Sequence, residues 1–276
     1  YNECVTYSFV DEKSAKLFDG GSDAVKLENP ISSEMSHMRP DLLVGLLQAA
    51  SRNQARGFSD LALFEVGAAF HGGEPGEQHV QIGGLLVGAT GPKDVHGARR
   101  DVDVFDAKAD AEAILSSIGA PAKVQILRDT PSWFHPGRSG KIGLGPKKIM
   151  AQFGEVHPKT LKEMGVKGPA VAFTVFLEQP PFPRGGKAAR PAFFTNDLQA
   201  VERDFAFVVD KDVAALAVVN AAFGADKNLI EDVRVFDEFI GGSLGEDKKS
   251  LAITVRLQPA KETLKDKDIE EVSAKI

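Results

Sequence analysis

Cysteine is almost absent from this chain of 276 residues, which contains only Cys4. One thiol cannot form an internal disulfide, and without a CxxC pair or a Cys/His cluster we expect no structural zinc. No apolar run approaches the roughly 18 residues that span a bilayer. The N-terminus has no initiator Met and no basic segment, so we expect no signal peptide and a chain that starts in mid-protein. These absences favour a cytoplasmic protein without a membrane anchor.

Positive charge is also scarce. The chain has 33 Lys/Arg against 39 Asp/Glu, a formal net charge of −6 and a pI near 5.6. Taken alone, this balance counts against a nucleic-acid binder, which usually carries a basic surface. Most of the excess of acidic over basic residues lies from Arg190 onward, where the net charge is −5. The hydrophobic share of 43% and the charged share of 26% are ordinary for a globular protein.

A break in composition predicts two domains, which also fits the length. The segment 180–187 holds three prolines and two glycines in eight residues, which suits neither a helix nor a central strand. We therefore expect a first domain at 1–180, a linker at 181–191 and a second domain at 192–276.

The first domain contains more predicted strands than helices. Pro40 and Asp41 suit the start of a helix, and apolar residues then recur at helical spacing until Arg56-Gly57. A second helix is expected at about 106–118. Strands are expected at 61–67, 81–87, 123–127, 139–144, 151–156 and 170–177. This pattern predicts an α+β domain in which an antiparallel sheet is flanked by helices.

The second domain follows a recognisable order of elements. Strands are expected at 205–209, 233–239 and 251–257, and helices at 213–223 and 266–276. The order βαββα is that of a ferredoxin-like domain that lacks its last strand. Alternation along the third strand points Leu251, Ile253, Val255 and Leu257 inward, and leaves Ser250, Ala252, Thr254 and Arg256 on the open face. By the same alternation Ala206 faces outward.

Common catalytic motifs are missing from the sequence. It has no phosphate-binding P-loop, no H-E-x-x-H and no G-x-G-x-x-G. Residues 241–245 match G-x-S-x-G, but charged residues and another strand follow, which favours a hairpin loop over a nucleophile elbow. His135 and Arg138 are candidates for acid–base chemistry or anion binding, although a turn and a salt bridge are the simpler roles.

Several motifs resemble, in order, those of bacterial phenylalanyl-tRNA synthetase β subunits. The stretch from Asn29 to Leu43 is similar to the family's NPISSE-x-x-x-LRPSLL, and 201–209 is similar to its VRRDLAFVV strand, although Glu202 stands where the family often has arginine. Further matches are Phe64–Gly67, Phe134–Ser139, Gly154–Pro158, Leu229–Asp237 and Lys249–Ala252.

The resemblance implies a first domain with the class II synthetase fold but without catalysis. A working class II site needs an Arg-x-Glu strand and a G-x-G-x-x-x-R strand, whose arginines neutralise the phosphates of ATP. The chain contains no Arg-x-Glu, and Ile149 stands where the second arginine is required. The same resemblance places the helix that begins near Pro40 at a subunit interface, with Pro40, Leu43, Val44 and Leu47 as contact residues.

For the second domain the resemblance implies binding of the tRNA anticodon. It assigns contacts to Ala206, Asp237 and Ser250, and the open-face alternation adds Thr254 and Arg256. A solvated sheet face is the alternative for each of them. The alternation places no aromatic side chain on this face, so we expect no stacking platform for bases.

The partners implied by the resemblance are a catalytic α subunit, in a heterotetramer of two α and two β chains, and tRNA-Phe. We expect no cofactor in this chain, whereas the whole ligase uses ATP and magnesium. Two other functions stay open: an active class II-like ligase, and a stand-alone RNA-binding or protein-interaction module. The first would catalyse ATP–pyrophosphate exchange alone, and the second would not copurify with an α chain.

Overall fold

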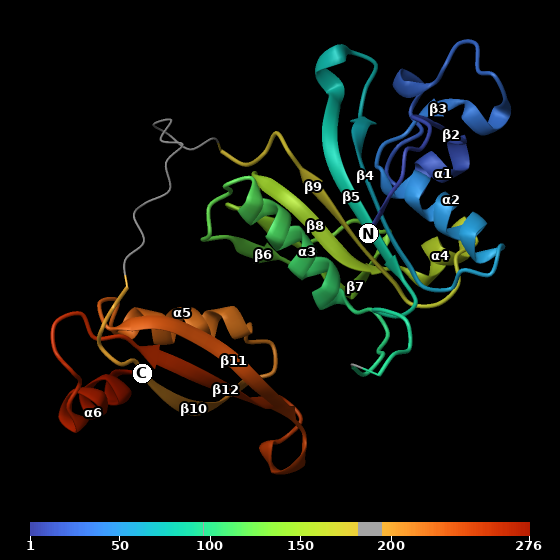
Figure 1. Ribbon diagram of the computed structural model, residues 1–276. Helices are drawn as coiled ribbons and strands as arrows, with labels where there is room; N and C mark the ends of the chain where they lie inside the picture. Colours follow the sequence, from blue (N-terminus) through green and yellow to red (C-terminus); the bar gives the residue numbers. More distant parts are fainter. Residues whose placement is uncertain (96, 182–194) are drawn as a thin grey trace. The chain divides into compact units, whose positions relative to one another are not determined.

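The computed structural model describes residues 1–95, 97–181 and 195–276, and it divides into two compact units, Tyr1–Gly186 and Lys187–Ile276 (Figure 1). The linker expected at 181–191 lies, apart from Pro181, outside the described residues. Each unit has its own hydrophobic core and is described by itself.

The first unit is built on a seven-stranded sheet in the order β1-β4-β5-β9-β8-β7-β6. Neighbouring strands are antiparallel, except that β1 runs parallel to β4. The strands are β1 (Asn2–Glu3), β4 (Leu61–Phe70), β5 (Gln78–Val87), β6 (Gln125–Leu127), β7 (Phe134–Gly143), β8 (Ile149–Val156) and β9 (Ala170–Phe176). A small second sheet pairs β2 (Phe9–Val10) with β3 (His37–Met38). The predicted α+β class is confirmed.

Helices cover both faces of this sheet (Figure 1). Alternate residues of β9 point to opposite faces, so Val171 and Phe173 pack with α3 (Val104–Ser117), whereas Ala170 and Ala172 pack with α2 (Leu43–Gln54). Two shorter helices, α1 (Glu12–Lys16) and α4 (Pro158–Met164), contribute apolar side chains to the α2 side.

The start of α2 differs from the predicted one. The helix begins at Leu43 rather than at Pro40-Asp41. Asp41 is 3% exposed, and its carboxylate accepts hydrogen bonds from the Leu43 amide at 2.9 Å and from the Thr174 hydroxyl at 3.3 Å. Asp41 therefore connects the helix to the sheet. Burial raises the pKa of its carboxyl group to about 6.

The expected interface on α2 has to be corrected. Leu43, Val44 and Leu47 are all 0% exposed, and Pro40 is buried as well. Leu43, Val44 and Leu47 pack between the sheet and the residues of α1 and α4 within the first unit. A side chain that is enclosed by its own domain offers no surface to another subunit, so these four residues do not form the predicted contact.

The second unit has the βαββα order that the sequence predicts. Its antiparallel sheet has the order β10-β12-β11 and packs against two helices. The elements are β10 (Val201–Asp210), α5 (Ala215–Ala225), β11 (Ile230–Ile240), β12 (Lys248–Leu257) and α6 (Asp266–Lys275). The segment 241–245 connects β11 to β12 and is followed by a strand, so it is a hairpin loop and not a nucleophile elbow.

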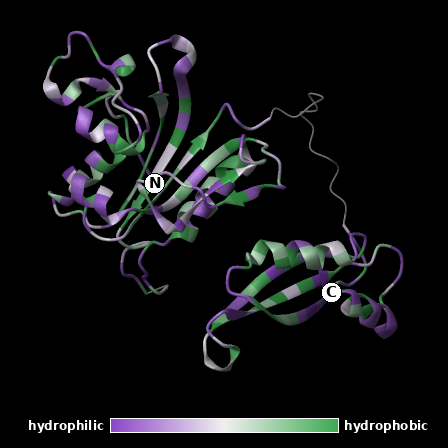
Figure 2. Ribbon diagram, turned by 180° about the vertical axis from the view of Figure 1, so that it is seen from behind, coloured by the Kyte–Doolittle hydropathy of each residue, from purple (hydrophilic) through white to green (hydrophobic). Residues whose placement is uncertain are grey.

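One face of this sheet forms a core and the other is open. Leu251, Ile253, Val255 and Leu257 are at most 1% exposed. The last three pack with Ala222 of α5 and with Ile269 and Val272 of α6. The intervening residues of β12 lie on the opposite face, because apolar and more polar residues alternate along this strand. Alternating hydropathy colours are visible on the sheet of the second unit (Figure 2). No described helix of the second unit packs on that open face.

Candidate nucleic-acid interface

The open face of the second unit consists of rows of residues paired across three strands. Directly opposed residues point to the same side of a sheet. One row joins Ala206, Ala252 and Asp237, and the next joins Val208, Ser250 and Phe239. Three of the predicted contact residues, Ala206, Asp237 and Ser250, therefore lie in two adjacent rows.

Irregularities in β11 put Asp237 on this face. The register shifts between Val235 and Asp237, because Val235 pairs with the buried Ile253 whereas Asp237 pairs with Ala252. One extra residue, Phe236, is accommodated there as in a β-bulge. Strict alternation from the buried Val233 would have turned Asp237 and Phe239 toward the core. The bulge reverses this orientation for both.

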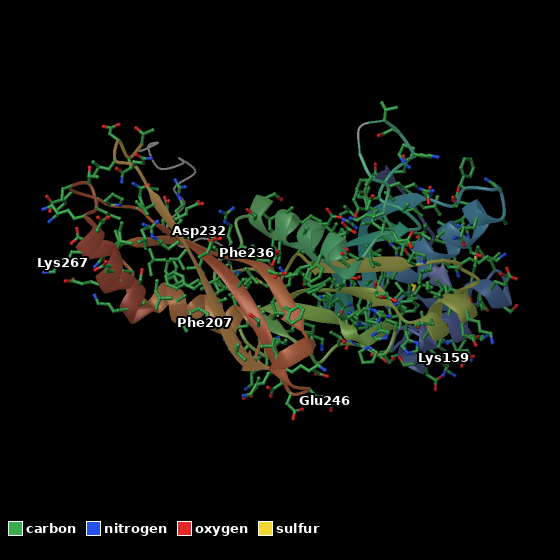
Figure 3. All side chains as sticks on the ribbon, turned by 90° about the horizontal axis from the view of Figure 1, so that it is seen from below. Lys159, Phe207, Asp232, Phe236, Glu246 and Lys267 are labelled. Carbon is green, nitrogen blue, oxygen red and sulfur yellow. The ribbon has the colours of Figure 1, made fainter. Side chains whose placement is uncertain are left out.

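Two aromatic side chains lie exposed beside the small residues. Phe236 is 58% exposed and lies in the bulge, and Phe239 is 52% exposed and pairs with Ser250. Figure 3 labels Phe236 on β11. The expectation of an open face without aromatics is therefore wrong. The neighbouring apolar residues Val235 and Phe236 break the alternation, and this signal could have revealed the bulge from the sequence.

The other two predicted residues lie at the opposite end of the face. Thr254 donates a hydrogen bond from its hydroxyl to Asp204 at 2.7 Å. Arg256 forms ion pairs with Glu231 at 2.8 Å and with Glu202 at 3.4 Å. Neither polar group is free, so this end differs chemically from the end with the two phenylalanines.

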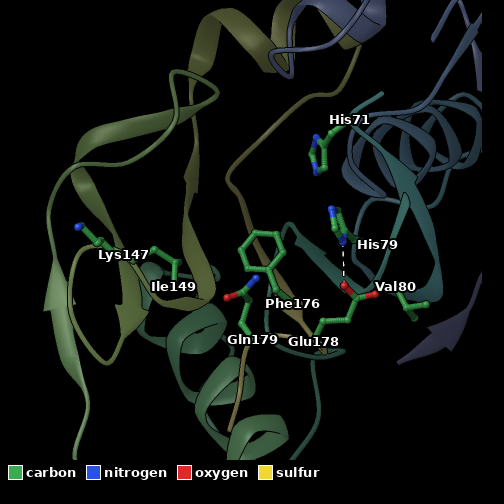
Figure 4. A pocket seen from close by; sticks show the side chains of 8 residues that line it. All are labelled: His71, His79, Val80, Lys147, Ile149, Phe176, Glu178 and Gln179. Carbon is green, nitrogen blue, oxygen red and sulfur yellow. Dashed lines mark hydrogen bonds and ion pairs between the residues drawn. The ribbon is translucent and has the colours of Figure 1, made fainter. Parts of the chain in front are cut away.

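The first unit has a hollow of 310 Å³ beside the β4–β5 hairpin (Figure 4). His71 and His79 face each other with their ring centroids 5.6 Å apart, and His79 Nδ1 lies 2.8 Å from Glu178 Oε2. Burial, and then the neighbouring His79, lower the pKa of His71. Lys147 is the one lysine among the described lining residues, and no arginine lines the hollow.

Two arginines of the first unit that are candidates for anion binding, Arg39 and Arg138, are paired with carboxylates. Arg39 is 3% exposed and reaches Glu65 at 2.7 Å and the Ala68 carbonyl at 2.9 Å. Arg138 binds Glu155, and the His135 ring accepts a hydrogen bond from the Gly137 amide at 3.1 Å. Both candidates from the 134–139 motif thus have structural partners.

The described parts of the chain hold neither a cluster of metal ligands nor a helix that could span a membrane. Those residues contain no group of three or more His, Cys, Asp or Glu side chains placed to hold a metal ion. No helix within residues 1–95, 97–181 and 195–276 is long and apolar enough to cross a membrane.

Comparisons with known proteins agree on both units. Residues 1–177 match the family model described as the phenylalanyl tRNA synthetase beta chain CLM domain, and residues 197–276 match the ferredoxin-fold anticodon binding domain. Similar curated proteins include the phenylalanine–tRNA ligase beta subunits of Ruegeria pomeroyi and Cereibacter sphaeroides. They are 72% and 67% identical over the whole chain. That of Rhodospirillum rubrum is 50% identical over 99% of the chain. The chain spans about a third of the length of these relatives, 35%, 35% and 34% respectively.

Proposed function

Because the chain belongs to the family of phenylalanyl-tRNA synthetase β chains, we propose that it is a non-catalytic part of a phenylalanine–tRNA ligase. Its second unit binds the anticodon of tRNA-Phe, and its first unit supports a catalytic α subunit. The complete enzyme is a cytoplasmic heterotetramer of two α and two β chains. ATP and magnesium serve the α subunit, and this chain holds no cofactor of its own.

The observation that carries this proposal is the grouping of Phe236 and Phe239 with Ala206, Asp237 and Ser250 on one open face. Sequence-specific RNA recognition targets unpaired bases that stack on aromatic rings and expose their edges to polar groups. Phe239 offers a ring of this kind, and the small side chains of Ala206 and Ala252 leave room for a base to approach the sheet. An anticodon loop presents unpaired bases.

Polar groups beside the rings supply the hydrogen bonds. The Asp237 carboxylate accepts from N–H donors on base edges, and the Ser250 hydroxyl both donates and accepts. Ser250 is partly buried next to Phe239, so its position is fixed by the sheet. Stacking supplies affinity, and these two groups supply the choice of base.

Three features support a first unit of the class II synthetase type without catalysis. Its antiparallel sheet is flanked by helices on both faces. The described residues that line the hollow of Figure 4 include no arginine to clamp phosphates. Arg39 is buried against Glu65 and cannot reach a ligand. The competing function of an active ligase would require such cations.

ATP should therefore not bind to this chain with useful affinity. Calorimetric titration of ATP with magnesium into the isolated chain should give no site tighter than about 1 mM, because the hollow of Figure 4 offers no arginine to stabilise the phosphate charge. The α/β assembly serves as the positive control. A micromolar ATP site in the isolated chain would contradict the non-catalytic role.

A different surface replaces α2 as the proposed contact with the α subunit. Val66 and Val80 are 51% and 42% exposed on the face of β4 and β5 that shares its side with α3. They are diagonal neighbours in the register, because Val66 pairs with Ile82 and Ala68 with Val80. Exposed apolar side chains that lie side by side are typical of protein contacts.

Val66→Lys combined with Val80→Lys should weaken α-subunit association at least tenfold and leave the fold unchanged. The charges would lie in a desolvated contact, which costs more than the lost apolar area. Copurification and analytical ultracentrifugation measure the effect. Ile118→Lys is the matched control, since Ile118 is 40% exposed. Equal association of both variants would remove this surface from the proposal.

The function as a whole is tested by reconstitution from the complete β subunit and the α chain. Aminoacylation of tRNA-Phe should require both, and the chain should copurify with the α chain from its native source. A stand-alone RNA-binding module would be purified from the native source without an α chain, and that result would contradict the proposal.

A further inference from the structure

The open face of the second unit has two chemically different halves. One half holds Phe236, Phe239 and the small residues described above, and we call it the aromatic half. The other half holds four carboxylates and two arginines, and we call it the ion-paired half. Its residues are Glu202, Asp204, Glu231, Asp232, Arg234 and Arg256. Figure 3 labels Asp232 and Phe236, one from each half, along β11.

The ion-paired half is a continuous network across the three strands. Glu202 on β10 pairs in register with Arg256 on β12, which pairs with Asp232 on β11. The Glu202 carboxylate contacts Arg256 at 3.4 Å and Arg234 at 3.5 Å, and so joins the two arginines. A second bulge, between Ile230 and Asp232, places Glu231 beside Arg256, where its carboxylate lies 2.8 Å from the guanidinium.

In this network, neighbouring carboxylates balance the positive charge of each arginine. Arg256 faces two carboxylates, and Arg234 contacts Glu202 and, at 3.3 Å, Asp232. Four acidic groups against two basic groups give this half a net charge of −2. A phosphate group that approaches here meets repulsion and must displace a carboxylate before it can bind either arginine.

From this arrangement we infer that Glu202 and Glu231 are specificity-determining residues. By holding Arg256 in ion pairs they deny the RNA backbone a cationic contact at this half, and they confine RNA to the aromatic half, where bases rather than phosphates are recognised. The inference rests on the proposed function of the same face. It assigns the two acids a role without any contact to RNA.

The physical reason is the difference between phosphate and base contacts. Phosphate contacts are independent of sequence and strengthen the binding of every tRNA, whereas base contacts discriminate. A free arginine beside the aromatic half would therefore raise the affinity for all tRNAs and lower the ratio between the correct tRNA and others. Exposed ion pairs contribute little to folding stability, so their removal leaves the fold intact.

The test is Glu202→Gln combined with Glu231→Gln in the complete α/β assembly. Dissociation constants for tRNA-Phe and for a tRNA of another amino acid are measured between 50 and 300 mM KCl. The variant should bind the wrong tRNA about fivefold more tightly, the scale of one added hydrogen bond of ordinary strength. The slope of log K against log salt should steepen by about 1 for each phosphate gained.

Two matched variants make the result specific. Glu262→Gln combined with Glu270→Gln removes the same charge from exposed positions outside the network and should leave the slope unchanged. Adding Arg256→Gln to the first variant should abolish its gain, because Arg256 is the group that is released. The inference is overturned if the two double variants behave alike, or if the gain survives the loss of Arg256. The proposed function fails separately, if Phe239→Ala leaves tRNA-Phe binding unchanged.

Discussion

Truncation of Phe239 to alanine should weaken binding of tRNA-Phe by the complete α/β assembly about 5- to 150-fold. This range corresponds to about 1–3 kcal/mol for one base stacked on an aromatic ring. Phe239 is half-exposed next to Ser250, so its loss removes a ring without opening a cavity in the core. Phenylalanyl-adenylate formation should not change, because the proposed function assigns this reaction to the α subunit.

The controls separate stacking from a loss of structure. Phe239→Tyr keeps the ring and should bind tRNA-Phe as the unchanged protein does. Phe105→Ala removes an aromatic side chain that is 71% exposed on α3 of the first unit, and it should have no effect on tRNA binding. A Phe239→Ala assembly that binds tRNA-Phe with unchanged affinity would contradict the proposed interface.

Removal of Arg39 should lower the free energy of unfolding of the first unit by about 3–5 kcal/mol. The Arg39 and Glu65 side chains are each 4% exposed and lie 2.7 Å apart, so Arg39→Met leaves the Glu65 carboxylate buried without its charge partner. Chemical denaturation, monitored by the single Trp133 of the first unit, measures the loss.

A double variant tests whether the loss of stability comes from the unpaired charge of Glu65. Arg39→Met with Glu65→Leu removes both charges and should regain most of the lost stability, since an apolar pair of similar volume often replaces a buried ion pair without cost. The Thr6 hydroxyl donates a hydrogen bond to Glu65 and loses this partner in the double variant. The recovery of stability is therefore incomplete. If Arg39→Met costs no more than a surface substitution, Arg39 is not a structural residue, and the explanation for the missing phosphate clamp weakens.

The orientation of β12 was predictable because its alternation is regular. Leu251, Ile253, Val255 and Leu257 occupy every second position, and the structure buries all four. Alternation determines the face of every residue in a strand as long as the register is unbroken. Ser250, Thr254 and Arg256 therefore lie where the sequence places them.

Strict alternation gives the wrong face for the end of β11, where the neighbouring apolar residues Val235 and Phe236 are the one local sign of a bulge. Two bulges interrupt its pairing with β12, and each moves the following residues to the other face. Asp237 and Phe239 reach the open face for this reason. The ion pairs of Arg256 depend on the same irregularities and on residues far apart in the chain, so no local pattern reveals them.

The helix α2 shows that an apolar pattern predicts burial but not the element that covers the helix. Apolar residues at helical spacing predict that a helix has a buried side, but they do not tell what buries it. Leu42, Leu43, Val44, Leu46 and Leu47 form an almost continuous apolar run, and all are 0% exposed. A helix that is apolar on most sides is buried on most sides, and in this chain the first unit itself supplies the cover. The burial of this run within its own domain removes the support for the predicted subunit contact.

Discrimination between anticodons is the most direct test of the central claim, that the open face of the second unit recognises the anticodon. Aminoacylation is measured with tRNA-Phe and with a tRNA-Phe in which one anticodon base is exchanged. The enzyme is the complete α/β assembly, either unchanged or carrying both Asp237→Ala and Ser250→Ala. The unchanged enzyme should prefer the correct anticodon. The double variant should lose about 5- to 150-fold of that preference in kcat/KM, as expected for about 1–3 kcal/mol of base-directed hydrogen bonds. ATP–pyrophosphate exchange should stay the same. An undiminished preference in the double variant would contradict the account.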